Sequence, residues 1–355
     1  MRKYSFIIGL FSCISIFIIL LIYVPLGNKL ELTIYDLYIN SIAKDPDPQI
    51  VIVDVDDYSI NQASDKSSEG LGRYPWPRTT FTKIMSIITR GKPKAIVLDV
   101  NFEGKTVYKE KEYSDKEFIE QLKSIPDVFI LQKTNLPGYN FNKELNNILE
   151  KQKFNNDKEK VTATSYYISS LYSDGPINLL KPHYYNVIDH TTNNEHIQSL
   201  LHYYKLPRYI DGIYKYAKQI AVSNSFTDND NTVRSYQPVY KYVDNYLLST
   251  PLAVANFVKG GNNQIVLSEK VLKFGDKTIS LNDKMRFFIN WRKYADKTSL
   301  EHKPFTIYKN RCYKYISFYN LLYYQKYNIN PEIFKDKIVV IGNSSDIAKD
   351  NVAIP

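Results

Sequence analysis

The chain has 355 residues, enough for one large domain or two small ones with a sizeable hydrophobic core. Hydrophobic residues make up 44% and charged residues 23%, a balance that excludes wholesale disorder. The net charge of +9 comes largely from Lys residues scattered among Asp and Glu, whereas a nucleic-acid interface needs clustered basic residues, so we expect no nucleic-acid partner.

Residues 4–24 carry no charged side chain. A helix of this length, rising about 1.5 Å per residue, would cross the roughly 30 Å hydrocarbon layer of a membrane. Arg2 and Lys3 precede the segment, so the positive-inside rule places the N-terminus in the cytoplasm. One alternative is a cleaved signal peptide, but the segment is longer than the apolar part of such peptides and lacks a small-residue cleavage site. The other is a buried core helix, but such a helix would show a polar face and this segment has none.

These features predict a cytoplasmic tip and transmembrane anchor in residues 1–27 and an extracytoplasmic domain in residues 28–355. The expected protein crosses the cytoplasmic (inner) membrane once. Its domain would face the periplasm or the exterior.

The segment after the anchor predicts a short amphipathic helix and then a buried strand. Apolar residues at three- and four-residue spacing indicate a helix over residues 30–42, which the DPDP sequence at 45–48 ends. The β-branched run IVIVDVDD at 50–57 is apolar on both faces, which is typical of a buried parallel strand.

A helix and a second buried strand follow. The loop GRYPWPR at 72–78 leads into a helix whose first turn suits Pro77, and Gly91 is its stop signal. The run KAIVLDVNF at 94–102 predicts the strand, which completes a strand–helix–strand unit. The apolar face of this helix is expected to consist of Phe81, Ile84, Met85 and Ile88.

Regular patterns then weaken. Ser114 and Glu117 have the spacing of a capping box, which predicts a helix beginning at Ser114. The run at 127–134 predicts a third strand. Residues of about 138–206 are rich in Asn, Lys and Tyr, and we interpret them as an insertion with local helices.

The remaining elements have clearer signals. The predicted elements are a hairpin within 233–248 turning at Asp244 and Asn245, a helix at 250–258, a hairpin turning at Gly275 and Asp276, a strand at 285–292, a helix at 316–325 and a buried strand at 335–346. Together they predict one α/β domain. We expect a mixed sheet with a parallel βαβ core, an antiparallel portion and helices on both faces, plus the N-terminal transmembrane helix.

Five segments taken together resemble the second class of CHASE domains (cyclase/histidine-kinase-associated sensing extracellular domains). They are IVIVDVDDYSI, GRYPWPRTTFTKI, KAIVLDVNF, NTVRSYQPVYKY and FKDKIVVIGNSSDIAKDNVAIP, in this order. The resemblance covers residues 30–355 apart from the insertion. It gives particular weight to the loop residues Arg73, Pro75, Trp76 and Pro77 and to Gly342 after the closing strand.

The resemblance implies an extracytoplasmic input domain of a bacterial transmembrane receptor. Relatives of this class usually continue into further membrane spans and a cyclase or kinase output module. This chain ends at Pro355 without a second long apolar segment, so we expect a fragment of a receptor or a solitary sensor. The resemblance indicates no ligand, which could be a small molecule or a protein.

Acidic and small polar residues follow three of the predicted strands. In an open α/β sheet, ligands bind at the carboxyl ends of parallel strands. A carboxylate cluster there could bind a hard cation, an amine or another cationic ligand. The candidate ligand-binding residues are Asp54, Asp56, Asp57, Arg78, Asp99, Asp346 and Asp350, and the polar residues Asn101 and Asn343 follow two of the same strands.

A structural interpretation of the same residues is favoured over ligand binding. In it, Asp54 and Asp99 cap loops, and Arg73 or Arg78 pairs with one of them. Trp76 would then fill the loop against the core.

An enzymatic alternative is a membrane-tethered phosphatase of the haloacid dehalogenase type. There, Asp54 would attack phosphorus and Asp56 would act as acid/base beside Mg²⁺. That pattern requires Thr or Val where Tyr58 stands and an acid where Asn343 stands, and both departures count against it.

Other catalytic and cofactor signals are missing. The sequence has no P-loop, G-x-G-x-x-G, H-E-x-x-H or C-x-x-C motif, and we expect no cofactor. Cys13 lies in the apolar N-terminal run, which leaves Cys312 without a disulfide partner in the domain. The spacing of His183, His190, His196 and His202 matches no common zinc pattern.

The sequence thus predicts a sensory input domain and not an enzyme. We expect it to transmit a ligand- or partner-induced change through its N-terminal helix, as a homodimer. The alternatives are the tethered hydrolase and a solitary scaffold or adhesion module.

Overall fold

The computed structural model describes residues 29–64, 71–72, 74–100, 102, 111–125, 127–132, 184–192, 211–242, 245–292 and 313–346. The predicted anchor at 4–24 and the candidate residues Arg73, Asn101 and Asp350 lie outside these ranges, as do three of the four clustered histidines. Within the described ranges, none of the helices combines the length and the apolar character needed to span a bilayer.

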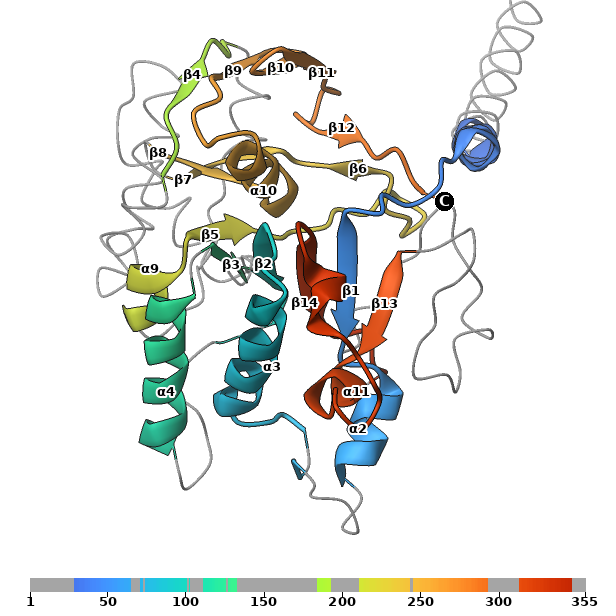
Figure 1. Ribbon diagram of the computed structural model, residues 1–355. Coiled ribbons are helices and arrows are strands. Elements are labelled where there is room, and N and C mark those ends of the chain that lie inside the picture. Colours follow the sequence, from blue (N-terminus) through green and yellow to red (C-terminus); the bar gives the residue numbers. More distant parts are fainter. Residues whose placement is uncertain are drawn as a thin grey trace, which may run out of the picture.

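A six-stranded sheet in which all neighbouring strands run parallel forms the centre of the fold (Figure 1). Its strands are β1 (Ile50–Asp54), β2 (Ala95–Leu98), β3 (Val128–Gln132), β5 (Gln219–Val222), β13 (Lys314–Ser317) and β14 (Ile338–Gly342). The strand order is β13-β1-β14-β2-β3-β5. The last strand of the chain therefore lies between the first two, so β1 and β2 of the predicted strand–helix–strand unit are parallel without being neighbours.

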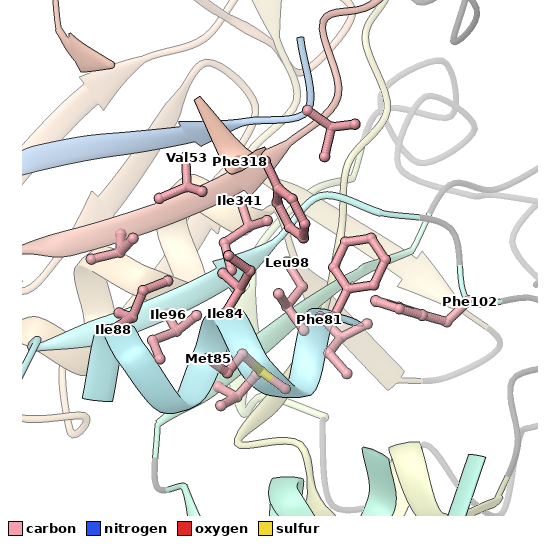
Figure 2. Close-up of a cluster of buried hydrophobic side chains, with 14 of the residues drawn as sticks. Val53, Phe81, Ile84, Met85, Ile88, Ile96, Leu98, Phe102, Phe318 and Ile341 are labelled. Carbon is pink, nitrogen blue, oxygen red and sulfur yellow. The ribbon is translucent and has the colours of Figure 1, made fainter. Parts of the chain in front are cut away.

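One face of this sheet is covered by helices. They are α2 (Asp57–Ser64), α3 (Arg78–Arg90), α4 (Lys111–Ser124), α9 (Asp211–Tyr216) and α11 (Phe318–Leu322), with the short 3₁₀ helix η3 (Pro331–Phe334) beside α3. The apolar face predicted for α3 is confirmed: Phe81, Ile84, Met85 and Ile88 are buried. Figure 2 shows these side chains packed against strand residues such as Val53, Leu98 and Ile341.

The opposite face of the sheet is covered differently. Helix α10 (Thr250–Val258) and the hairpin of β7 (Val239–Tyr242) and β8 (Asn245–Leu248) pack there on alternate side chains of β2, β3 and β5. A second, four-stranded sheet joins the same core; it consists of β4 (Val187–Asp189), β9 (Ile265–Ser268), β10 (Val271–Phe274) and β11 (Lys277–Ser280). Helices on both faces are thus confirmed.

The expected single mixed sheet is wrong. The six-stranded sheet is entirely parallel and the antiparallel pairs lie in other sheets, because the antiparallel segments pack on its face instead of pairing with its edge strands. The region interpreted as an insertion also contributes to the fold, since its strand β4 pairs in parallel with β9.

Three local predictions need correction. Residues 316–317, which we expected to open a helix, end strand β13, and α11 begins at Phe318. The predicted strand at 285–292 shrinks to β12 (Phe287–Phe288), paired with β6 (Ser235–Tyr236). The β7–β8 turn falls one residue early, because Asn245 already pairs with Tyr242.

Ser114 does not begin a helix, since α4 begins at Lys111. The hydroxyl of Ser114 is buried and accepts a hydrogen bond from the backbone N–H of Thr79, at 3.2 Å. Ser114 therefore satisfies a free backbone donor in the first turn of α3, a neighbouring helix, instead of its own.

The predicted helix after the anchor is confirmed over residues 29–42. A short segment links it to the amino end of β1. In Figure 1 the helix lies at the upper right, and the β1 and β13 arrows point away from it, towards α2 and α11. The carboxyl edge of the sheet, with the candidate acids, is thus at the far end of β1 from this helix.

Candidate functional site

The turns after β1 and β14 are joined by carboxylates. Asp54 accepts two hydrogen bonds from Ser344, from the backbone N–H at 3.1 Å and from the hydroxyl at 2.6 Å. Asp57 accepts one from the backbone N–H of Asp346, at 3.0 Å. Strands β1 and β14, which are neighbours in the sheet, are therefore connected at their carboxyl ends by residues that we singled out as candidate ligands.

Asp56 stabilises the start of α2. Its carboxylate accepts hydrogen bonds from the backbone N–H of Ser59 at 2.8 Å, from the Ser59 hydroxyl at 2.5 Å and from the Ser317 hydroxyl at 3.0 Å. The first of these contacts has the geometry of a helix N-cap. Asp56 thus connects the β1–α2 turn to the end of β13.

Asp54 and Asp99 flank Gly342 across three adjacent strands. Asp54 pairs in register with Gly342, and the backbone N–H of Asp99 donates to the carbonyl of Ile341 at 2.7 Å. Side chains at alternate positions share a face, so Asp54 and Asp99 belong to the face opposite α3. A Cβ atom built on Gly342 would lie 4.0 Å from the Cβ of Asp99, which leaves space between the two carboxylates.

The two carboxylates differ in environment. Asp99 is exposed, whereas Asp54 is partly buried. The pKa of Asp54 is raised to about 6, chiefly by burial and in part by the nearby charges of Asp56 and Asp57, against the opposing effect of the Ser344 hydrogen bonds. This edge therefore holds one carboxyl whose protonation changes in the mildly acidic range.

The Asp54 carboxyl makes the stability of the domain depend on pH. Its pKa in the folded protein lies above the unfolded value of about 3.9, so the proton favours the folded state, and stability falls as pH rises from about 4 to 6. We expect Asp54→Asn, which cannot ionise, to raise the free energy of unfolding by about 2 kcal/mol at pH 7.5 and to change it little at pH 4. Urea unfolding at both pH values measures this.

A matched control for that prediction is Asp283→Asn, because Asp283 is highly exposed in a surface pair with Lys270. We expect a change below about 0.5 kcal/mol at either pH. An equal loss of stability in Asp54→Asn at both pH values would contradict the prediction, because it would mean that the Ser344 hydrogen bonds outweigh the cost of burying the charge.

Arg78 forms its ion pair with a different residue from the ones expected. Its guanidinium donates to Asp115 of α4 at 2.7 Å and to the carbonyl of Phe102 at 2.8 Å. The side chains of Arg78 and Asp115 are 7% and 14% exposed, so this is a largely buried ion pair. Arg78 thus joins α3, α4 and the loop after β2, and the expected pairing with Asp54 or Asp99 is replaced by Asp115.

The loop before α3 is packed on aromatic rings. Trp76 is 4% exposed, stacks on Phe318 with ring centroids 5.3 Å apart, and donates its indole N–H to the carbonyl of Gly72 at 3.2 Å. The Tyr74–Pro75 peptide bond is cis, and Pro77 precedes the first residue of α3. Trp76 therefore holds this loop against the core.

Residues required for the phosphatase alternative are engaged in local contacts. Asn343 donates to the Tyr74 hydroxyl at 3.0 Å and accepts from the backbone N–H and hydroxyl of Ser345. Asp56, the proposed acid/base, makes the capping contacts given above. Among the described residues, no three Asp, Glu, His or Cys side chains gather closely enough to hold a metal ion. No observation in this region favours phosphoryl transfer.

A charge cluster around the buried Arg234, which the sequence did not predict, joins helix 29–42 to the body of the domain. Arg234 is 2% exposed and donates two hydrogen bonds to Asp36 of this helix, both at 2.7 Å. It also donates twice to Asp230, at 2.9 and 2.8 Å, and once to Asp228, at 3.1 Å. Asp230 therefore has a pKa well below its usual range.

Arg234 stood within one of the segments used for the resemblance, NTVRSYQPVYKY, but its partner Asp36 is 198 positions away. The sequence offered one indication of this cluster: an Arg in a strand-like run of alternating apolar and polar residues, with two Asp residues shortly before it. That signal does not identify the third partner.

The comparisons with known proteins decide the family. A model of the CHASE2 domain matches residues 13–355. The chain belongs to the CHASE2 family. No curated protein and no solved structure matches it.

Membership of the CHASE2 family characterises this chain as a sensory extracellular domain of the kind found in signalling receptors. The match includes the predicted insertion within its range. It also begins inside the apolar N-terminal run and therefore includes helix 29–42.

Proposed function

We propose that this CHASE2 chain is the extracytoplasmic input domain of a bacterial receptor, anchored in the cytoplasmic membrane by residues 4–24 and without enzymatic activity of its own. In this proposal a ligand binds at the carboxyl edge of the parallel sheet. The resulting change in the domain reaches the membrane through helix 29–42.

The contact between Arg234 and Asp36 is the observation that carries this proposal. A helix that only linked an anchor to a domain would need no buried, doubly hydrogen-bonded contact with it. Here the guanidinium fixes the helix to the loop that contains Asp228 and Asp230. A shift of that loop would therefore move the helix.

An electrostatic interaction between the sheet edge and the segment that contains Arg234 also supports coupling of the ligand site to helix 29–42. Tyr236 lies two residues after Arg234, in β6. Burial raises the pKa of Tyr236 to about 12, and the negative charge of Asp99 contributes to the rise. Asp99 is therefore close enough to the Arg234 segment for a cation bound at the edge to change the local electrostatic field.

The ligand best suited to this edge is a small cation such as an amine. Asp54 and Asp99 provide two carboxylates on either side of the space above Gly342. Asp56, Asp57 and Arg78 already make internal contacts that position the surrounding turns. We assign direct ligand contact to Asp54 and Asp99 because they flank this space, although Asp54 also binds Ser344, and positioning roles to the other three.

A thermal-shift screen of the full chain in detergent micelles, with amines and inorganic cations, tests ligand binding. A ligand at a hundredfold excess over its Kd is expected to stabilise the folded state by about 2.7 kcal/mol. The stabilisation should be lost in Asp54→Ala and Asp99→Ala and kept in Asp283→Ala. Stabilisation that survives both site variants would place the ligand elsewhere, and no response to any compound would favour a scaffold.

Membrane topology is tested separately. Single cysteines at exposed positions of the domain, such as Asp283, should react with a membrane-impermeant maleimide added to intact cells. Labelling that requires cell lysis would place the domain inside the cell and overturn the proposal.

A further inference from the structure

Helix 29–42 has two apolar faces, and only one of them contacts the domain. The inner face carries Leu32, Tyr35, Asp36 and Ile39; Ile39 is buried, Asp36 binds Arg234, and the Tyr35 ring lies 5.2 Å from that of Phe288. The other face, which we call the outer stripe, consists of Leu30, Ile34, Leu37, Tyr38 and Ile42.

The outer stripe is unusually exposed. Its five side chains have exposed fractions of 59%, 57%, 67%, 59% and 44%. They make up five of the seven large apolar side chains that are exposed in the described part of the chain, so the exposure is concentrated on this one helix face. Contiguous apolar surface of this kind marks an interaction site.

The spacing of the outer stripe fits a second helix. Leu30, Ile34 and Leu37 follow each other at steps of four and three residues, and Ser41 completes the next step. This is the spacing of a coiled-coil seam, in which side chains of one helix pack between those of another. The stripe carries no charged residue, so two identical stripes can meet without repulsion.

The charges of the helix argue against a lipid surface as the occupant. A helix that lies on a membrane carries Lys and Arg on its polar face, where they meet anionic headgroups. Between residues 29 and 42 the basic residues are limited to Lys29, while Glu31 and Asp36 are acidic. Asp36 is moreover bound to Arg234, which fixes the other side of the helix against the domain.

We propose that the outer stripe of helix 29–42 is the seam of a parallel homodimer, in which two copies of this chain pack the helix side by side. The parallel arrangement rests on the proposed function, because anchors in one membrane would place both helices in the same direction and at the same height. The contact between the stripes does not depend on which side of the membrane the domain occupies.

The size of the stripe indicates how strongly the copies associate. The five side chains form a small patch, so an interface built on it lies near the lower limit of about 1,200 Å² in total for specific interfaces. A dimer of this size is weak in free solution. A shared membrane raises the effective concentration and stabilises it.

Disulfide cross-linking of the full chain tests the seam. In a background of Cys13→Ser and Cys312→Ser, single cysteines are placed by Ile34→Cys and Leu37→Cys in the stripe and by Asn40→Cys on an exposed position beside it. In detergent micelles and in vesicles, the two stripe variants should form disulfide dimers under mild oxidation at least tenfold faster than Asn40→Cys. Equal rates at the three positions would overturn the proposal.

A charge-matched pair of variants tests the contribution of the stripe to association. Leu37→Glu places a charge in the seam and should raise the dimer dissociation constant at least tenfold in analytical ultracentrifugation, whereas Asn40→Glu should leave it within twofold. Both positions are exposed, so an unchanged thermal midpoint verifies folding. A wild-type chain that is monomeric at all concentrations, in micelles and in vesicles, would overturn the proposal.

A lipid surface remains distinguishable from a second copy. A fluorophore attached at Asn40→Cys, beside the stripe and outside the seam, should not be quenched by lipids that carry a quencher in their headgroup region, because the partner helix keeps this side of the helix away from the lipid. Strong quenching without cross-linking would assign the stripe to the membrane and overturn the dimer. The dimer proposal and the receptor-topology proposal are tested independently, because cross-linking in micelles does not depend on the side of the membrane on which the domain lies.

Discussion

Replacing Arg234 with methionine is expected to lower the free energy of unfolding by about 3 kcal/mol and to release helix 29–42 from the domain. Methionine keeps much of the apolar volume but removes the guanidinium that Asp36, Asp228 and Asp230 share. Removing one member of a buried charge cluster costs about 3–5 kcal/mol, because the remaining charges lose their partner. The lower end applies here, since the three carboxylates keep partial contact with water.

Two measurements separate loss of stability from release of the helix. Urea unfolding gives the first, and amide hydrogen exchange of residues 29–43 gives the second, as a rise in exchange rate confined to this helix. Lys270→Met is the control, because Lys270 pairs with Asp283 on the surface and its loss should cost under about 0.5 kcal/mol. Unchanged exchange in Arg234→Met would show that apolar contacts alone hold the helix.

The pH dependence of this contact follows from Asp230. Its pKa in the folded protein lies below the unfolded value, so its contribution to stability is complete above a pH of about 4 and is lost as the pH falls further. The contact of Asp230 with Arg234 should therefore persist through the mildly acidic range in which Asp54 changes its protonation. Asp54 and Asp230 thus change their protonation in separate pH ranges.

Replacing Gly91 with alanine is expected to destabilise the domain by about 3 kcal/mol. Gly91 ends α3 with φ −78°, a conformation that alanine adopts freely, so the cost is purely steric. An added Cβ would lie 2.1 Å from the carbonyl oxygen of Pro331 and 2.9 Å from the Cβ of Phe334. Because the closer atom belongs to the backbone, α3 and η3 must move apart, and overpacking of this kind costs about 1–3 kcal/mol or more.

Gly342→Ala is the matched control, because the nearest atom to its added Cβ, in Asp99, is 4.0 Å away. We expect a change within about 1 kcal/mol, in either direction, by urea unfolding. Similar losses in the two variants would contradict the steric explanation. The control also reduces the space between Asp54 and Asp99, so it should weaken binding of a cation at the sheet edge.

Several elements could be predicted from the sequence alone because their signals are local. The β-branched runs ending at Asp54 and before Asp99 are strands, and the 3.6-residue pattern from Phe81 to Ile88 is the buried face of α3. Burial of a strand or a helix face constrains residues within a few positions of each other. The acids after β1 and β14 were likewise placed at one edge by the general rule for parallel sheets, and hydrogen bonds between Asp54 and Ser344 join them.

Contacts between distant parts of the chain required the tertiary structure. Strand β13 is only four residues long and has one buried residue, Ile316, so its parallel pairing with β1 was needed to identify it. The hydroxyl of Ser114 was free to cap either its own helix or α3, and the packing of α4 on α3 decided between them. The partner of Arg78 proved to be Asp115, since both residues lie where these helices meet.

The sequence by itself determined the family, the α/β class and the main secondary structure of this CHASE2 domain, because each depends on short-range patterns of apolar and turn residues. The tertiary structure decided the insertion of β14 between β1 and β2, the separation of the described strands into four sheets, and the contact of Asp36 with Arg234. A charged side chain can form an ion pair with any opposite charge that the fold places next to it. Which charge that is depends on chain segments hundreds of residues apart, and no local pattern encodes it.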